Sequence, residues 1–180
     1  MARQQNKMKP LLVLTDKQIF PDFELDVDIT YELRLAVKIV AFDGAGQLAL
    51  VGTKYRLLPG GGVEEGETFE EAVWREAKEE MGCDVKIERE IGVTEEYRAK
   101  IGRHQETHFF LATVLGDKGV PTTTQEDEQG IQIDWVTLDR AIVLLEEQVK
   151  NISTQSYHSC FNVRTHLVAL KELKKQTTPR

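Results

Sequence analysis

Runs of apolar and β-branched residues mark the predicted strands of this chain. Tyr31 to Phe42 is a β-rich run, and the sequence Asp43-Gly44-Ala45-Gly46 after it is typical of a hairpin turn leading into Gln47 to Lys54. The remaining predicted strands are Leu11 to Thr15, Val85 to Tyr97, Glu106 to Leu115 and Gln132 to Val136. We therefore expect a sheet assembled from segments spread along the whole sequence.

Helical signals lie between and after these strands. Thr68 with Glu71 three residues later forms a capping box, and Gly82 is placed to end a helix, so the sequence predicts a helix over Phe69 to Met81. Apolar spacing predicts two further helices, Leu138 to Val149 and Ser159 to Lys175. Strands mixed with packed helices indicate the α+β class, with a mixed β-sheet.

Length and composition fit one domain of ordinary size. The chain has 180 residues, of which 41% are hydrophobic, enough to build a core. We expect a flexible tail over residues 1–9, a single domain over 10–176 and a C-terminal tail over 177–180.

Charge and cysteine content exclude several function classes. A net charge of −7 argues against a general nucleic-acid binder, because an acidic surface repels phosphate backbones. The two cysteines, Cys83 and Cys160, form no disulfide framework. Leu11 to Leu14 is too short for a signal-peptide core, and no run reaches membrane-spanning length. We expect a cytoplasmic protein with no nucleic-acid or membrane partner.

The predicted helix over Phe69 to Met81 carries carboxylates where a core helix normally carries hydrocarbon. With Phe69 at zero on a helical wheel, Glu76 falls at about 340° and Glu80 at about 20°, which is inside the apolar sector. Glu79 flanks them at about 280°. Partly buried, mutually repelling carboxylates are costly unless a cation neutralises them. The competing interpretation is a solvated acidic face that forms ordinary i,i+4 pairs.

An all-oxygen donor set indicates a hard cation. Carboxylates without a nearby Cys/His cluster suit Mg²⁺, with Mn²⁺ as the alternative, and suit Zn²⁺ poorly. Because Mg²⁺ is commonly shared with substrate phosphates, a phosphate-containing small molecule is the expected ligand of this acidic chain. The glycine-rich segment Leu57-Leu58-Pro59-Gly60-Gly61-Gly62 before the helix can bring backbone groups to that site.

From Gly61 to Cys83 the chain resembles the box of the Nudix hydrolase superfamily. The match consists of Gly61, Glu67, Arg75-Glu76, Glu79-Glu80 and Gly82 at the family's spacing. Ala77 and Cys83 stand where the family commonly has bulky aliphatic residues, and we interpret them as packing variants. The flanking Leu58-Pro59-Gly60 and Trp135-Val136 are also similar to the family. The resemblance implies an α/β/α sandwich around a mixed sheet.

The same resemblance implies roles for individual residues. Glu76, Glu79 and Glu80 become the metal carboxylates, and the carbonyl of Gly60 is expected to add a ligand. Glu67 and Arg75 are implied to form an ion pair that holds the loop against the helix.

The reaction that the family implies is Mg²⁺-dependent hydrolysis of a nucleoside diphosphate derivative, NDP-X + H₂O giving NMP + P-X. Glu79 is the first choice for the general base and Glu128, in the polar loop before Trp135, is the second. Family members often pair, so a homodimer is a further expectation. The alternative function is a Nudix-like module that binds a nucleotide without turnover. Oxidised nucleoside triphosphates, nucleotide sugars and dinucleoside polyphosphates all stay open as substrates.

Weaker candidates for substrate contact lie outside the box. Lys54 and Arg56 precede the glycine segment and could meet phosphate or base, although surface solubility is the simpler explanation for each. Four ring-bearing residues could also bind or stack on a substrate, against the simpler reading of ordinary packing: Phe42, Tyr97, His104 and His108.

Overall fold

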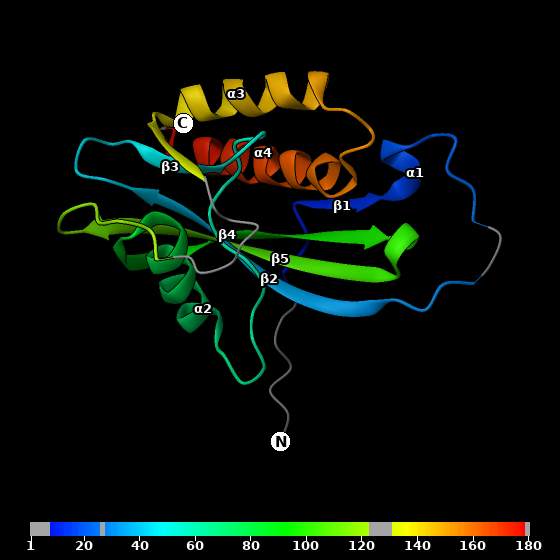
Figure 1. Cartoon of the computed structure of the whole chain (residues 1–180), viewed down its shortest axis with the longest axis horizontal. Helices are drawn as coiled ribbons and strands as arrows, with labels where there is room; N and C mark the ends of the chain where they lie inside the picture. Colours follow the sequence, from blue (N-terminus) through cyan, green and yellow to red (C-terminus); the bar gives the residue numbers. More distant parts are fainter. Residues whose placement is uncertain (1–7, 26–27, 123–130, 179–180) are drawn as a thin grey trace.

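A mixed six-stranded sheet forms the centre of the molecule in a computed structural model that describes residues 8–25, 28–122 and 131–178 (Figure 1). The strands are β1 (Leu12–Thr15), β2 (Glu32–Phe42), β3 (Leu48–Gly52), β4 (Asp84–Arg98), β5 (Arg103–Leu115) and β6 (Gln132–Val136). The helices are α1 (Asp16–Ile19), α2 (Phe69–Glu76), α3 (Leu138–Asn151) and α4 (Tyr157–Thr177), with a π-helical turn η1 at Ala77–Met81 and a 3₁₀ turn η2 at Ala99–Ile101.

The sheet order is β1-β4-β5-β2-β3-β6. β2 and β5 run parallel in the centre, β1 runs parallel to β4 at one edge, and the other pairs are antiparallel. The predicted hairpin between β2 and β3 is only partly formed, because these strands pair at a single position, Phe42 with Leu48. β3 pairs along its length with β6 instead.

The glycine-rich segment takes the place beside β2 that the hairpin leaves open. Val37 N donates to Gly61 O at 2.9 Å, Ile39 N donates to Pro59 O at 2.9 Å, and Val63 N donates to Leu35 O at 3.0 Å. Segment 59–63 is therefore fixed to a central strand by backbone hydrogen bonds, which gives the residues beside it a rigid support.

Helices cover both faces of the sheet, so the expected α/β/α sandwich is confirmed (Figure 1). α2 packs on one face through a core that includes Val73, Ala77 and Phe110. α3 and α4 cover the other face through a second core that includes Leu145, Leu170 and Phe109. Ala77 and Cys83, the two small variants within the box, are both fully buried in the first core.

The helix after the glycine segment begins as expected and ends in a wider turn. Thr68 and Glu71 form the capping box, but the predicted single helix over Phe69 to Met81 becomes π-helical from Ala77 onward. Gly82 then closes it with φ of 65°, and a Cβ there would lie 2.5 Å from the Val120 carbonyl carbon. π-turns are uncommon and are frequent at functional sites, and this one carries Glu79 and Glu80.

The N-terminal region contains an element that the hydrophobic pattern did not predict. The strand expected at Leu11 to Thr15 is present as β1, and the one-turn helix α1 follows it directly, with Gln18 Oε1 accepting from Thr15 N at 2.8 Å. Within the described residues, no helix combines the length and the apolar character needed to cross a membrane.

Candidate functional site

Gly60 joins the glycine segment to the carboxylate-bearing helix. Its N–H donates to Glu80 Oε2 at 2.6 Å, and its φ of +125° lies in the region that L side chains rarely adopt. A Cβ at this position would lie 2.3 Å from Val37 O on β2. Only glycine can therefore pass this close to the strand while presenting its N–H to Glu80.

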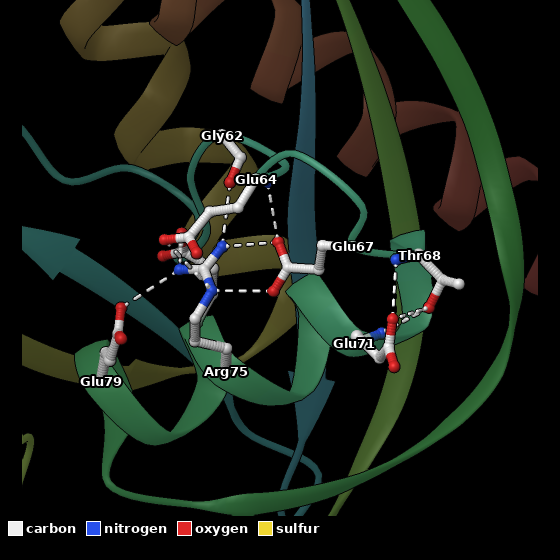
Figure 2. Close-up of polar contacts among 8 residues, drawn as sticks. Gly62, Glu64, Glu67, Thr68, Glu71, Arg75 and Glu79 are labelled. Carbon is white, nitrogen blue, oxygen red and sulfur yellow. Dashed lines mark hydrogen bonds and ion pairs between the residues drawn. The ribbon is translucent and has the colours of Figure 1, made fainter.

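Arg75 organises the site from the middle of α2 (Figure 2). Its Nε and one Nη donate to the two oxygens of Glu67 at 2.9 and 3.0 Å, a bidentate arrangement. The same Nη donates to Gly62 O at 2.9 Å, and the other Nη donates to Glu76 Oε1 at 2.8 Å and to Glu79 Oε2 at 3.3 Å. The Glu67–Arg75 pair thus holds the loop against the helix, and Arg75 also touches two of the proposed metal carboxylates.

Glu76 is the buried member of the acidic group, in line with its place in the apolar sector of the wheel. Burial raises the pKa of its carboxyl, the hydrogen bond from Arg75 opposes that rise, and the neighbouring charge of Glu80 adds to it. Glu76 also lies against Gly61, where a Cβ would approach Oε1 to 2.4 Å. A carboxylate that is both buried and repelled by a neighbour binds a proton or a cation more readily than a solvated one.

The three carboxylates face different partners. Glu76 and Glu79 are turned to Arg75, and Glu80 is turned to the Gly60 N–H. In the part of the chain that the structure describes, no three His, Cys, Asp or Glu side chains converge closely enough to hold a metal ion as they stand. The donor chemistry still fits a hard cation, because the group is all-oxygen and includes the mutually repelling pair Glu76 and Glu80.

Lys38, on β2, is a site residue that the sequence analysis missed. It is half-buried and donates a short hydrogen bond to Gly60 O, the carbonyl expected to bind a metal. Burial lowers the pKa of its ammonium group, while the charges of Glu80 and Glu76 oppose that shift. The sequence did offer a signal for Lys38, because this charged residue stands between two apolar residues of a strand, Val37 and Ile39, which are both buried.

The other candidates from the sequence have varied surroundings. Arg56 is held by Asp134, Gln132 and the carbonyls of Gly52 and Thr53, so its guanidinium is engaged in holding β3 to β6. Lys54 Nζ lies 5.2 Å from the ring centroid of its neighbour Tyr55. Glu128, the second choice for the base, lies outside the described residues.

The ring-bearing candidates make contacts within the protein. Tyr97 stacks on His104 with ring centroids 4.3 Å apart, and the His108 ring lies 4.1 Å from the Phe69 ring at a tilt of 31°. Phe42 packs against the core beneath α3 and α4.

Comparisons with known proteins agree with this architecture. The NUDIX domain family matches residues 32–159 of the chain. No curated protein matches significantly. A solved structure described as a MutT protein from Methanosarcina mazei Go1 has a TM-score of 0.56 and 14% identity, with 84% of this chain and 100% of that one covered. A solved structure described as a NUDIX hydrolase from Nitrosomonas europaea has a TM-score of 0.58 and 19% identity, with 81% of this chain and 90% of that one covered. At these identities the two structures support the fold.

Proposed function

The chain belongs to the NUDIX domain family and is a Nudix hydrolase, and we propose that it cleaves the diphosphate linkage of a nucleoside diphosphate derivative, NDP-X + H₂O giving NMP + P-X, with Mg²⁺. The observation that carries this proposal is the arrangement around the Gly60 peptide, where Glu80 accepts from its N–H and the buried Glu76 lies against the adjacent Gly61. Acidic groups are thereby held rigidly beside a segment whose glycines leave room for a ligand.

Glu76, Glu79 and Glu80 are the residues that would hold the metal. Bound there, Mg²⁺ would neutralise the phosphate oxygens and orient the attacking water. Mn²⁺ has the same preference for oxygen donors and is the expected substitute. The family resemblance adds the Gly60 carbonyl to this set, and the same carbonyl accepts a hydrogen bond from Lys38.

Hydrolysis needs one base and one broken bond. The water oxygen attacks a phosphorus of the diphosphate and its proton passes to a carboxylate. The bond from that phosphorus to the bridging oxygen breaks, and the leaving phosphate retains the electron pair. Glu79 is our proposed base, because its side chain is 37% exposed and its contact with Arg75 is long, at 3.3 Å, which leaves the carboxylate accessible to water. Glu128 is the second candidate.

Lys38 contributes positive charge close to the acidic group. Its ammonium interacts electrostatically with Glu80 and Glu76, and a partly desolvated cation beside the acidic group would stabilise negative charge that develops on phosphate oxygens. We therefore include Lys38 among the residues that assist the reaction.

A hydrolysis panel tests the proposal. The purified protein is incubated with a nucleoside triphosphate, a nucleotide sugar and a dinucleoside polyphosphate, with Mg²⁺ or with EDTA, and the products are identified by chromatography and mass spectrometry. We expect a nucleoside monophosphate to appear only with Mg²⁺, and ¹⁸O from labelled water to enter one phosphate product. A panel with binding but no turnover would instead support the nucleotide-binding module.

A further inference from the structure

A cavity lined by cationic side chains lies on the α4 side of the sheet. It measures about 230 Å³ and is bordered by Arg34, Lys38, Arg98 and Arg103, together with Gly60 and Gly61. α4 closes it from above through His158 and Asn162, and Figure 1 shows α4 lying along this face of the sheet. Four positively charged groups around one small cavity contrast with the net charge of −7 for the whole chain.

Arg98 is the structural member of this group. It forms a buried ion pair with Glu96, and its Nη atoms contact His158 Nδ1 at 3.0 Å and Asn162 Oδ1 at 2.7 Å. The charge of Arg98 is therefore already balanced by Glu96, and its donors are engaged in attaching α4 to the sheet.

Among the described residues, Arg34 and Arg103 form no ion pair with a carboxylate, although the charges of Glu76 and Glu96 act on Arg34 at longer range. Arg34 donates to the neutral amide oxygen of Gln105 at 2.9 Å. Among the described residues, Arg103 takes part in no salt bridge and no side-chain hydrogen bond. Both side chains border the same cavity, because Arg103 on β5 is the register partner of Glu32, and Arg34 lies two residues further along β2 and so on the same face of the sheet. Two guanidiniums in one cavity form a receptor for a multiply charged anion.

Neighbouring groups respond to this positive potential. Burial lowers the pKa of Arg34, and the charges of Arg103 and Arg98 lower it further. Burial also lowers the pKa of His158, with further lowering by all three guanidiniums. The charges of Glu76 and Glu96 act on the pKa of Arg34 in the opposite direction, but each of these carboxylates is also bound to another guanidinium, Glu96 to Arg98 and Glu76 to Arg75.

The cavity adjoins the proposed catalytic site through a single residue, Gly60. Lys38 lines the cavity and donates to Gly60 O, while the N–H of the same residue donates to Glu80. A phosphate chain that places one phosphorus beside the glutamates can therefore extend past Lys38 to the guanidiniums of Arg34 and Arg103.

We propose that this cavity receives a phosphoryl group of the substrate beyond the attacked linkage, so that X is itself anionic and the substrate is a polyphosphate. This inference rests on the proposed function and narrows its substrate class. A nucleotide sugar with a neutral X would leave Arg34 and Arg103 without an anionic partner in the cavity. Inorganic pyrophosphate and nucleoside polyphosphates share the recognised group, so the first arm of the experiment measures pyrophosphate binding and the second measures turnover of a nucleotide.

The first arm measures anion binding without catalysis. Inorganic pyrophosphate is titrated calorimetrically into the protein in EDTA, for the wild type and for Arg34→Gln, Arg103→Gln and Arg140→Gln. Arg140 is an exposed arginine on α3 outside the cavity and serves as the matched control. We expect Kd to rise about tenfold or more in Arg34→Gln and in Arg103→Gln, because each loses charge-assisted hydrogen bonds, and to change less than about twofold in Arg140→Gln.

The second arm measures specificity. For a polyphosphate and a nucleotide sugar of the same base, such as ATP and ADP-ribose, Arg103→Gln should lower kcat/KM about tenfold or more for ATP and leave that for ADP-ribose within about twofold. Equal pyrophosphate affinity in the wild type and both cavity variants would overturn the proposal, even in an active hydrolase. Pyrophosphate binding that depends on Arg34 and Arg103, without any hydrolysis of the nucleotides, would overturn the proposed function but leave the cavity established as an anion site. Thermal unfolding midpoints verify that each variant is folded.

Discussion

Replacing Arg75 by methionine removes the central cation of the loop–helix junction. The side chains of Arg75, Glu67 and Glu76 are only 24%, 12% and 9% exposed, so solvent screens these contacts weakly. The substitution deletes the bidentate pair with Glu67 and the hydrogen bond to Glu76, and it leaves a buried carboxylate without its cation. Removing one partner of a buried pair typically costs about 3–5 kcal/mol, and since this site is partly exposed we expect a loss of about 3 kcal/mol in the free energy of unfolding.

Urea denaturation followed by circular dichroism measures this loss. For a chain of this length, about 3 kcal/mol also corresponds to a fall of roughly 6–12 °C in Tm. Lys78→Met is the matched control on the following turn, because Lys78 pairs with Asp84 at side-chain exposures of 51% and 72%, and an exposed pair contributes about 0–1 kcal/mol. A loss below about 1 kcal/mol for Arg75→Met, equal to that of the control, would refute the assignment of Arg75 as the junction's organiser.

Three further changes test the supports of the site. Gly60→Ala should cost about 1–3 kcal/mol in unfolding free energy and reduce turnover, because its Cβ would meet Val37 O; an unchanged Tm would contradict the backbone argument. His166→Leu should lower the free energy of unfolding, measured by urea denaturation, by about 1–3 kcal/mol, because the buried Nδ1 accepts a hydrogen bond from Leu58 N at 3.0 Å. An unchanged free energy of unfolding would show that the Leu58 N–H finds another partner. Burial opposes protonation of His108, yet its two glutamate partners raise its pKa above 6.5. The stability difference between wild type and His108→Gln should therefore be largest below pH 6.5 and shrink as pH rises through that raised value. A stability difference that grows with pH would contradict the upward direction of the pKa shift.

Local patterns predicted the elements around the box because local rules determine them. The capping box at Thr68 and Glu71 and the stop at Gly82 fixed both ends of the helical segment, and the wheel anticipated the burial of Glu76. The widening at Ala77–Met81 was not predictable, because a π-turn depends on how the end of the helix packs against its surroundings rather than on propensity.

Longer-range pairing was the other source of error. The turn at residues 43–46 correctly indicated a reversal of the chain, but it could not reveal that β3 would pair with β6 and that the glycine segment would occupy the edge of β2. Tertiary context decides such choices between strand partners.

The polar face beneath α4 escaped notice for a related reason. Arg34 and Lys38 alternate with apolar residues along β2, a pattern that normally indicates a solvated face. His158, Asn162 and His166 recur at helical spacing on α4 and supplied the missing signal, because a polar stripe on a helix that also has an apolar stripe can cover a polar strand face. The two stripes together would have identified the cavity.

The substitution Glu80→Gln tests the central claim most directly. Glutamine keeps an oxygen that can accept from Gly60 N, so folding should be retained while the charge is lost. The measurement is Mg²⁺-dependent release of nucleoside monophosphate, with Glu70→Gln, an exposed glutamate on the same helix, as control. We expect kcat/KM to fall about 100-fold or more in Glu80→Gln and to stay within about twofold in Glu70→Gln, with Tm unchanged in both. Equal turnover in Glu80→Gln and the wild type would contradict the assignment of this acidic group to metal-dependent hydrolysis.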